Sequence, residues 1–113
     1  MDFIALETAD QLKEIKSSGD YNVIFKHNVT CPISKGVKKD LEFDEDTLPI
    51  STPVYILDLL NHRDLSDAIA KDFNVEHESP QALVIKDGKC VYNSSLYDIT
   101  AEGMAKAMNQ PLP

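Results

Sequence analysis

The sequence is short of several residue types, and each shortage excludes a class of protein. It has two cysteines, Cys31 and Cys90, so it can form at most one internal disulfide, which is too few for a disulfide-stapled secreted scaffold. Four glycines and six prolines leave no low-complexity segment, which excludes a fibrous or disordered chain. Thiol chemistry is therefore favoured over a structural disulfide.

Basic residues and long apolar runs are also scarce. The 11 Lys and Arg against 19 Asp and Glu give a net charge of −8, so we expect neither a nucleic-acid partner nor an anionic membrane partner. The longest apolar runs, such as 23–25 and 54–57, are far below the roughly 20 residues that span a bilayer. The first 16 residues lack the basic segment and apolar core of a secretory signal, so we expect a cytoplasmic protein.

What remains is the composition of a folded chain. At 113 residues, 42% of them hydrophobic, the chain is long enough for one packed core and too short for two. We therefore expect a single domain over residues 1–113, with one catalytic or binding unit.

Apolar periodicity predicts alternating helices and strands in the first two thirds of the chain. Thr8 and Gln11 have capping-box spacing and precede a helix that ends before residues 17–19. The other predicted elements are a buried strand at 21–27, a helix from Pro32 to about 43, a strand at 53–58, and a helix capped by Asp64 with Phe73 on its apolar face. Such alternation indicates parallel strands joined by crossover helices.

The chain changes character after Pro80. Residues 82–86 and 89–93 flank Asp87-Gly88, a strong hairpin signal, so these two strands are expected to be antiparallel. Thr100 then caps a last helix, ended by Pro111. The predicted class is α/β, with a central mixed four-stranded sheet flanked by helices in the order α-β-α-β-α-β-β-α. The expected hairpin pairs are Ile85 with Cys90, Val84 with Val91 and Leu83 with Tyr92.

Cys31 stands between a predicted buried strand and a predicted helix, with Pro32 at the first helical position. Unpaired amides and the helix dipole at such a position favour the thiolate, which is the nucleophilic form of cysteine. The other interpretation is that Cys31 is a small buried hydrophobe near a turn. Residues 26–40 carry four Lys and one Asp, which would also stabilise a thiolate and attract an anion unless the lysines only form a solvated helix face.

Ser34 occupies the place where a Cys-x-x-Cys oxidoreductase has its resolving cysteine, which implies a mechanism with one thiol. The hairpin register puts Cys90 about five residues of strand, or roughly 16 Å, from Pro80. If Pro80 lies beside Cys31, that separation exceeds the roughly 7 Å between Cα atoms that a disulfide allows. Cys90 is therefore interpreted as a packed strand cysteine.

The three histidines, at positions 27, 62 and 77, lack metal-ligand spacing, so no metal site is expected. His27, at the end of a predicted strand, would either act as a base near Cys31 or be a capping or surface residue. We favour the second interpretation.

Several motifs carry a family resemblance. The order of elements around Cys31-Pro32-Ile33-Ser34, with Ser79-Pro80 before the hairpin, resembles the thioredoxin fold, in which a cis-proline packs against the catalytic cysteine. More narrowly, Thr30 to Ser34, Arg63 to Asp67 and His77 to Gln81 resemble the monothiol bacilliredoxins, the YtxJ family of bacillithiol-using bacteria.

This resemblance implies that the protein removes bacillithiol from S-bacillithiolated proteins. Cys31 would attack the mixed disulfide and keep the bacillithiol as an adduct, which free bacillithiol would then remove. Bacillithiol is thus a co-substrate, and no tightly bound cofactor is expected. Around the catalytic Cys31, the candidate substrate-binding residues are Thr30, Pro32, Ser34, Glu78, Ser79, Pro80 and Gln81.

Two alternatives stay open. The chain could be a thioredoxin-fold binding module whose Cys31 contacts a partner without turnover. Glutathione could also be the carried thiol, as in monothiol glutaredoxins. The alkylation rate of Cys31 separates a reactive thiolate from an ordinary thiol.

Overall fold

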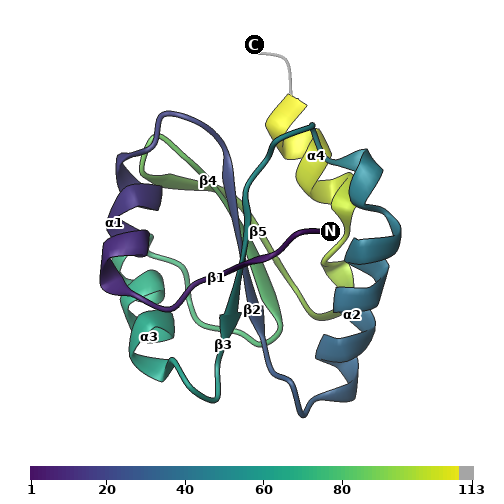
Figure 1. Ribbon diagram of the computed structural model, residues 1–113, viewed down its shortest axis with the longest axis horizontal. Coiled ribbons are helices and arrows are strands. Elements are labelled where there is room, and N and C mark those ends of the chain that lie inside the picture. The colour runs from purple at the N-terminus through teal and green to yellow at the C-terminus, as the bar shows by residue number, and fades with distance from the viewer. Residues whose placement is uncertain (110–113) are drawn as a thin grey trace.

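A sheet of five strands separates two pairs of helices (Figure 1). Helices α1 (Ala9–Ser17) and α3 (Arg63–Asp72) cover one face of the sheet, while α2 (Pro32–Phe43) and α4 (Ala101–Asn109) cover the other. This computed structural model describes residues 1–109, so the predicted helix end at Pro111 lies outside the described residues. None of the described helices is long and apolar enough to span a membrane.

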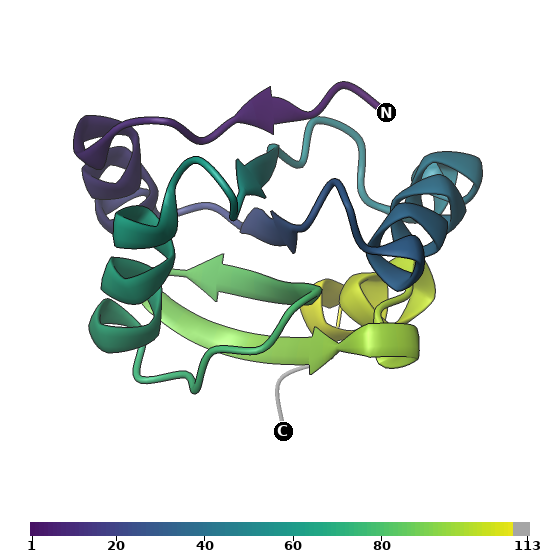
Figure 2. The ribbon, with the colours of Figure 1, turned by 90° about the horizontal axis from the view of Figure 1, so that it is seen from below.

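The strands follow the spatial order β1-β3-β2-β4-β5, which Figure 2 shows from top to bottom. Strands β1, β3 and β2 are mutually parallel, whereas β4 runs antiparallel to both β2 and β5. Two short 3-10 helices, η1 (Glu45–Thr47) and η2 (Leu96–Asp98), complete the elements. The strand bounds are β1 Ile4–Ala5, β2 Asn22–His27, β3 Val54–Asp58, β4 Gln81–Lys86 and β5 Lys89–Ser95.

The prediction of four strands was wrong by one, because β1 was missed. This strand has only two residues, Ile4 and Ala5, both exposed, so the apolar pattern carries no trace of it. Backbone pairing holds it in place: its residues lie opposite Tyr55 and Ile56, and the amide of Leu6 donates to the carbonyl of Ile56 at 2.9 Å. Strand β1 forms because β3 has an edge with unpaired backbone groups. The sequence around Ile4 does not show that this edge is nearby.

The hairpin forms at Asp87-Gly88 as predicted, but its register was only partly right. Ile85 does lie opposite Cys90, whereas a bulge between Val84 and Ile85 then shifts the pairing. The predicted partners Val91 and Tyr92 are therefore replaced by Tyr92 opposite Val84 and Asn93 opposite Leu83. Turn chemistry specifies the first pair of a hairpin, while a bulge depends on how the strand packs farther along.

Two of the three predicted helix caps are confirmed. Thr8 and Gln11 form the capping box of α1, and the Thr100 hydroxyl accepts from the amide of Gly103 at 3.0 Å. The third was wrong by two residues: α3 begins after His62, whose side chain makes no capping bond, and Asp64 lies within the first turn. An acidic residue stabilises the start of a helix from either place, so the sequence signal does not separate them.

The core consists of two apolar layers, one on each face of the sheet. Alternate residues of β2 serve both layers: Phe25 packs with Val37 and Met104 beneath α2 and α4, while Ile24 packs with Ile69 beneath α1 and α3. All six residues of β2 are buried, which confirms the predicted central strand. Strand β2, buried along its whole length, leads directly into the loop of residues 28–31, the cysteine loop.

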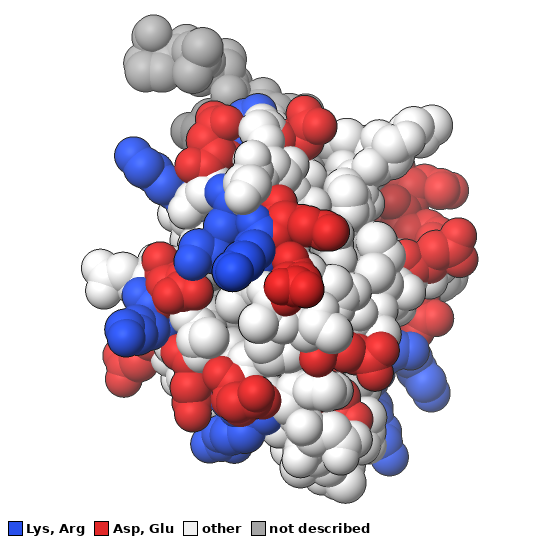
Figure 3. Space-filling view, turned by 60° about the vertical axis from the view of Figure 1, so that its left-hand side comes forward, with Lys and Arg blue, Asp and Glu red and all other residues white. Residues whose placement is uncertain are grey.

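The outer surface of the α1 and α3 layer carries acidic and basic side chains next to one another (Figure 3).

Candidate active site

Cys31 lies where β2 gives way to α2. It is the N-cap residue of this helix, with φ −93° and ψ 120°, and Pro32 follows in the first turn, as predicted. The backbone of Cys31 is held on both sides: its amide donates to the carbonyl of Asn28 at 3.1 Å, and its carbonyl accepts from the amide of Lys35 at 3.0 Å. The thiol is free, partly exposed and makes no capping bond. A thiolate here would face the unpaired amides of the first turn.

Asn28 organises the loop before Cys31, and the sequence prediction missed it. Its side-chain oxygen accepts from the amide of Thr30 at 3.0 Å and from the Thr30 hydroxyl at 2.8 Å. An Asn directly after a buried strand and two residues before Thr is a recognisable signal for such a turn. Thr30 is exposed beside the thiol, where a substrate can reach it.

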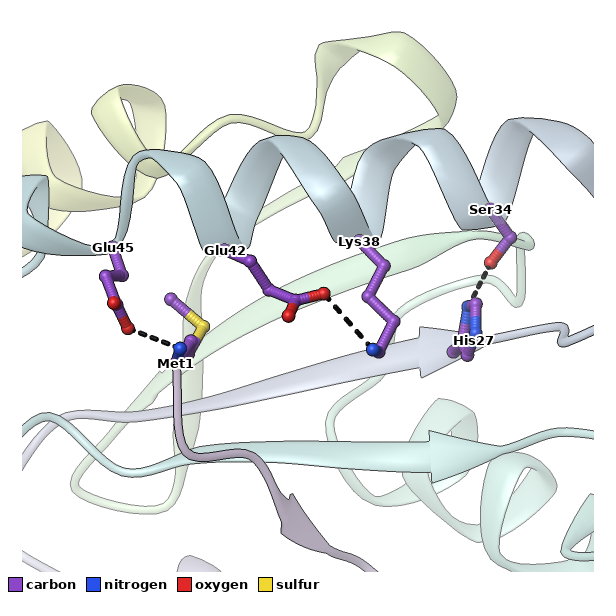
Figure 4. A network of polar contacts seen from close by, with 6 residues as sticks. All are labelled: Met1, His27, Ser34, Lys38, Glu42 and Glu45. Carbon is purple, nitrogen blue, oxygen red and sulfur yellow. Dashed lines mark hydrogen bonds and ion pairs between the residues drawn. The ribbon is translucent and has the colours of Figure 1, made fainter.

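Ser34 is fully buried and forms hydrogen bonds to two groups behind the cysteine. Its hydroxyl oxygen accepts from the amide of Asn28 at 3.0 Å and lies 2.6 Å from Nδ1 of His27 (Figure 4). The hydroxyl and the ring share one hydrogen bond, which the hydroxyl donates when Nδ1 is unprotonated and the ring donates when Nδ1 carries the proton. The residue that takes the place of a second cysteine thus fastens the loop to α2, and its burial keeps it off the rim of the site.

His27 is buried in β2, so the interpretation as a capping or surface residue was wrong. Its Nδ1 atom shares a hydrogen bond with the Ser34 hydroxyl, and its ring stacks on Phe25 with centroids 5.5 Å apart. Burial lowers the pKa of His27, and the nearby Lys38 lowers it further, which favours the neutral ring. No short stretch of sequence predicts this hydrogen bond, because it depends on how α2 packs against β2.

The Ser79-Pro80 peptide bond is cis, as predicted. Pro80 is buried directly before β4, whose first residue, Gln81, lies opposite Lys26 near the end of β2. The cysteine loop follows β2 at this same end, so Cys31 and Pro80 belong to neighbouring ends of adjacent strands. Gln81 is itself buried, and its side chain donates to the carbonyl of Glu76 at 2.9 Å. Glu78 is exposed and Ser79 partly exposed, so these two residues present the segment to solvent.

The basic surface predicted for residues 26–40 is smaller than expected. Lys26 is completely buried on the α3 side of the sheet, so it belongs to no surface. Lys38 forms an ion pair with Glu42 at 3.2 Å (Figure 4) and lies 5.4 Å from the ring centre of Phe3, so its ammonium group is turned toward partners within the protein. Lys35 and Lys39 are left as the exposed cations of this helix. Alternation along β2 places Lys26 and His27 on opposite faces, which a count of charges along the chain overlooks.

A cavity of about 430 Å³ opens beside the loop, at the carboxyl ends of β1, β2 and β3. Val29 and His27 line one side of it, and Lys38 lies among the acidic residues Glu7 and Asp58. Its charges are therefore mixed, and it offers no net attraction for an anion. Within residues 1–109, no group of three or more His, Cys, Asp or Glu side chains is arranged to hold a metal ion.

Cys90 has a different environment in β5. It is partly buried, and its thiol donates to the carbonyl of Tyr92 at 3.3 Å. Burial raises the pKa of Cys90 above its usual value, which disfavours the thiolate. This thiol therefore has the character of a packed side chain.

Comparison with known proteins agrees with this geometry. A family model described as monothiol bacilliredoxin BrxC matches residues 4–104. The chain belongs to the monothiol bacilliredoxin family. This confirms the predicted family, and with it a general role as a thiol oxidoreductase.

Solved structures place this bacilliredoxin among thioredoxin-like proteins. One, whose description gives it a thioredoxin fold, is 36% identical, with 92% of this chain and 91% of that chain covered and a TM-score of 0.81. A thioredoxin variant from Halobacterium salinarum is 13% identical, with 97% and 93% covered and a TM-score of 0.73. A Trypanosoma brucei brucei thioredoxin is 14% identical, with 94% and 87% covered and a TM-score of 0.74. The last two show the fold alone, and the predicted thioredoxin-like fold is confirmed.

Proposed function

We propose that this bacilliredoxin removes bacillithiol from proteins that carry it as a mixed disulfide. The observation that supports this most directly is the pair formed by Cys31 and Ser34. A partly exposed thiol sits at the start of α2, and a buried hydroxyl, bonded to His27 and Asn28, stands in the place of a second thiol. Without a neighbouring thiol, an adduct on Cys31 must be removed by a thiol from solution.

The exchange balances in two steps. The Cys31 thiolate attacks the bacillithiol sulfur of the mixed disulfide, a Cys31–bacillithiol disulfide forms, and the protein thiolate leaves and takes up a proton. The thiolate of a second bacillithiol molecule then attacks the bacillithiol sulfur of this adduct. Cys31 is restored as a thiolate, bacillithiol disulfide is released, and no other oxidant or reductant is needed.

The segment around Pro80 is the proposed recognition edge for the protein substrate. Ser79 directly precedes the cis bond and is partly exposed, so its backbone is available to an extended chain. Thr30 and Glu78 are exposed on the two segments that flank the thiol and complete the proposed rim. Gln81 and Ser34, both buried, support this rim from below.

Intact-protein mass spectrometry tests the proposal. The reduced protein is mixed with one model protein carrying either bacillithiol or glutathione on the same cysteine. We expect a bacillithiol adduct on Cys31, with release of the model protein's free thiol. The matched controls are Cys31→Ser, which should form no adduct, and Cys90→Ser, which should form it as the parent does.

Each other outcome contradicts a named part of the proposal. An adduct only from the glutathione-bearing substrate would make glutathione the carried thiol. The absence of any adduct on the folded parent, with partner binding intact, would make the protein a binding module. An equal loss of transfer in both cysteine variants would overturn the single-thiol mechanism.

A further inference from the structure

A lysine is completely buried at the functional end of the sheet. Lys26 is the fifth residue of β2, and its side chain passes beneath α3, away from the cysteine helix. Its Nζ atom lies 3.4 Å from the carbonyl oxygen of Ser66 and 3.2 Å from Nδ1 of His77. Burying an ammonium group is costly unless its donors find acceptors. The exchange chemistry proposed above makes no use of this lysine.

The contact between Lys26 and His77 has a defined direction. An ammonium group can only donate, so Nδ1 of His77 must accept, and the proton of the neutral ring is on Nε2. The Ser66 hydroxyl lies 3.2 Å from the same Nδ1 atom. The ring is thus held by β2 on one side and by α3 on the other.

His77 belongs to the segment that ends in the cis-proline. Residues 76–80 are the last part of the connection from α3, which ends at Asp72, to β4, which begins at Gln81, and a second anchor lies at the far end of this segment. There the Gln81 side chain donates to the carbonyl of Glu76 at 2.9 Å and accepts from the amide of Glu78 at 3.5 Å. Lys26 and Gln81 are direct partners in the pairing of β2 with β4. Two adjacent buried side chains therefore hold a segment whose outer face, at Glu78 and Ser79, is open.

We propose that Lys26 and His77 are positioning residues. Their contact holds the Ser79-Pro80 edge against β2, level with Cys31, so that a substrate chain can pair with this edge. This role rests on the proposed function, because it assumes that a protein substrate uses this edge. Loss of the contact leaves the thiol and its helix intact and loosens only the recognition edge. Binding of the protein substrate suffers, while the intrinsic reactivity of Cys31 does not.

The same contact gives the edge a dependence on pH. Protonation of Nδ1 removes the acceptor and creates a second cation 3.2 Å from Lys26. Burial lowers the pKa of His77, and Lys26 and Arg63 lower it further, against the opposite effects of Asp67 and Glu78. The accepting ring therefore prevails at neutral pH, and the edge is released when the solution is acidified.

The test compares Lys26→Met with Lys89→Met. The two variants remove the same charge, but Lys89 is exposed at the hairpin, far along the chain from the site. We expect Lys26→Met to lower kcat/KM for an S-bacillithiolated protein about tenfold, mainly through KM. Alkylation of Cys31 by iodoacetamide should keep the parent rate. Amide hydrogen exchange of residues 77–81 should accelerate in Lys26→Met and stay unchanged in Lys89→Met.

A second pair of variants protects the test against misfolding and separates positioning from simple packing. His77→Asn keeps a side-chain acceptor and does not titrate, whereas His77→Leu has no acceptor. We expect His77→Asn to recover most of the transfer that His77→Leu loses. At matched Cys31 thiolate fraction, the parent rate should fall on acidification, once the His77 ring gains its proton, and the His77→Asn rate should not; burial and Lys26 lower the pKa of His77, so the fall comes at a lower pH than for an ordinary histidine.

The outcomes separate this inference from the proposed function. A parent that transfers no bacillithiol, together with faster exchange in Lys26→Met, would overturn the proposed function and keep the positioning of the segment. Equal exchange and equal kcat/KM in Lys26→Met and Lys89→Met would overturn the positioning role. Equal transfer by His77→Asn and His77→Leu would do the same.

Discussion

Cys31 and Cys90 are the same residue type in one small protein, both partly exposed, but their backbone settings and hydrogen bonds differ. Cys31 is the N-cap residue of α2 and follows a loop held by Asn28. Its thiol makes no capping hydrogen bond. Cys90 lies in a strand, and its thiol donates to a backbone carbonyl while burial raises its pKa. The comparison shows that the backbone setting of a cysteine, and not the residue type alone, is what makes Cys31 rather than Cys90 the proposed nucleophile.

The largest expected effect is a difference in alkylation rate between the two thiols. With limiting iodoacetamide at neutral pH, we expect Cys31 to react about 100-fold faster than Cys90, because only the thiolate is nucleophilic. Peptide mapping by mass spectrometry follows both sites in one sample. Guanidinium chloride should bring the two rates together, which serves as the control. Similar rates in the folded protein would remove the basis of the comparison.

A second thiol beside Cys31 should shorten the life of its adduct. Ser34→Cys restores dithiol spacing, so the new thiol should attack the adduct and expel bacillithiol about tenfold faster than the parent loses it. Ser34→Ala, which has neither hydroxyl nor thiol, is the matched control and should keep the adduct. The product to be measured is a protein with an internal disulfide, lighter by two hydrogen atoms. A long-lived adduct in Ser34→Cys would contradict the expectation that a thiol at position 34 lies within reach of an adduct on Cys31.

The exposed charge near Cys31 should have a smaller effect. Lys35→Glu should slow transfer about two- to fivefold at low salt and less at high salt, because exposed charges are screened over roughly 10 Å at 0.1 M. Rates are compared at matched thiolate fraction, with Lys89→Glu as a variant of equal charge change. A salt-independent loss, or an equal loss in Lys89→Glu, would show that Lys35 does not attract the substrate.

The smallest effect concerns the stability that Cys90 contributes. Burial raises its pKa above 9.0, so the folded state keeps a proton that the unfolded chain releases. This contribution is complete below pH 9 and is lost as the pH rises through the raised pKa of Cys90. Denaturant unfolding should show a steeper alkaline decline in the parent than in Cys90→Val, with transfer unchanged by that substitution. Parallel declines would mean that Cys90 is solvated like Cys31.

Much of the fold could be predicted because its signals are local. The capping box at Thr8 and Gln11, the buried run of β2 and the turn at Asp87-Gly88 each act over a few residues, and each appears where expected. Strand β1 and the bulge beyond Ile85 could not be predicted in this way. Both depend on a partner strand that is distant in the chain, so no short window of sequence contains their cause.

In the candidate site, too, some features follow from the order of residues in the chain and others from how its elements pack. By itself, the sequence determined the order of strand, Cys31, Pro32 and helix, the missing second thiol at Ser34 and the proline at position 80, because these are properties of the chain read in order. Strand alternation already turns Lys26 and His27 to opposite faces of the sheet, but only the tertiary structure decided their partners, His77 for the first and Ser34 for the second. The physical reason is that a buried polar side chain must find its partner in whichever element packs over it, and packing brings α2 and α3 to the two faces of β2.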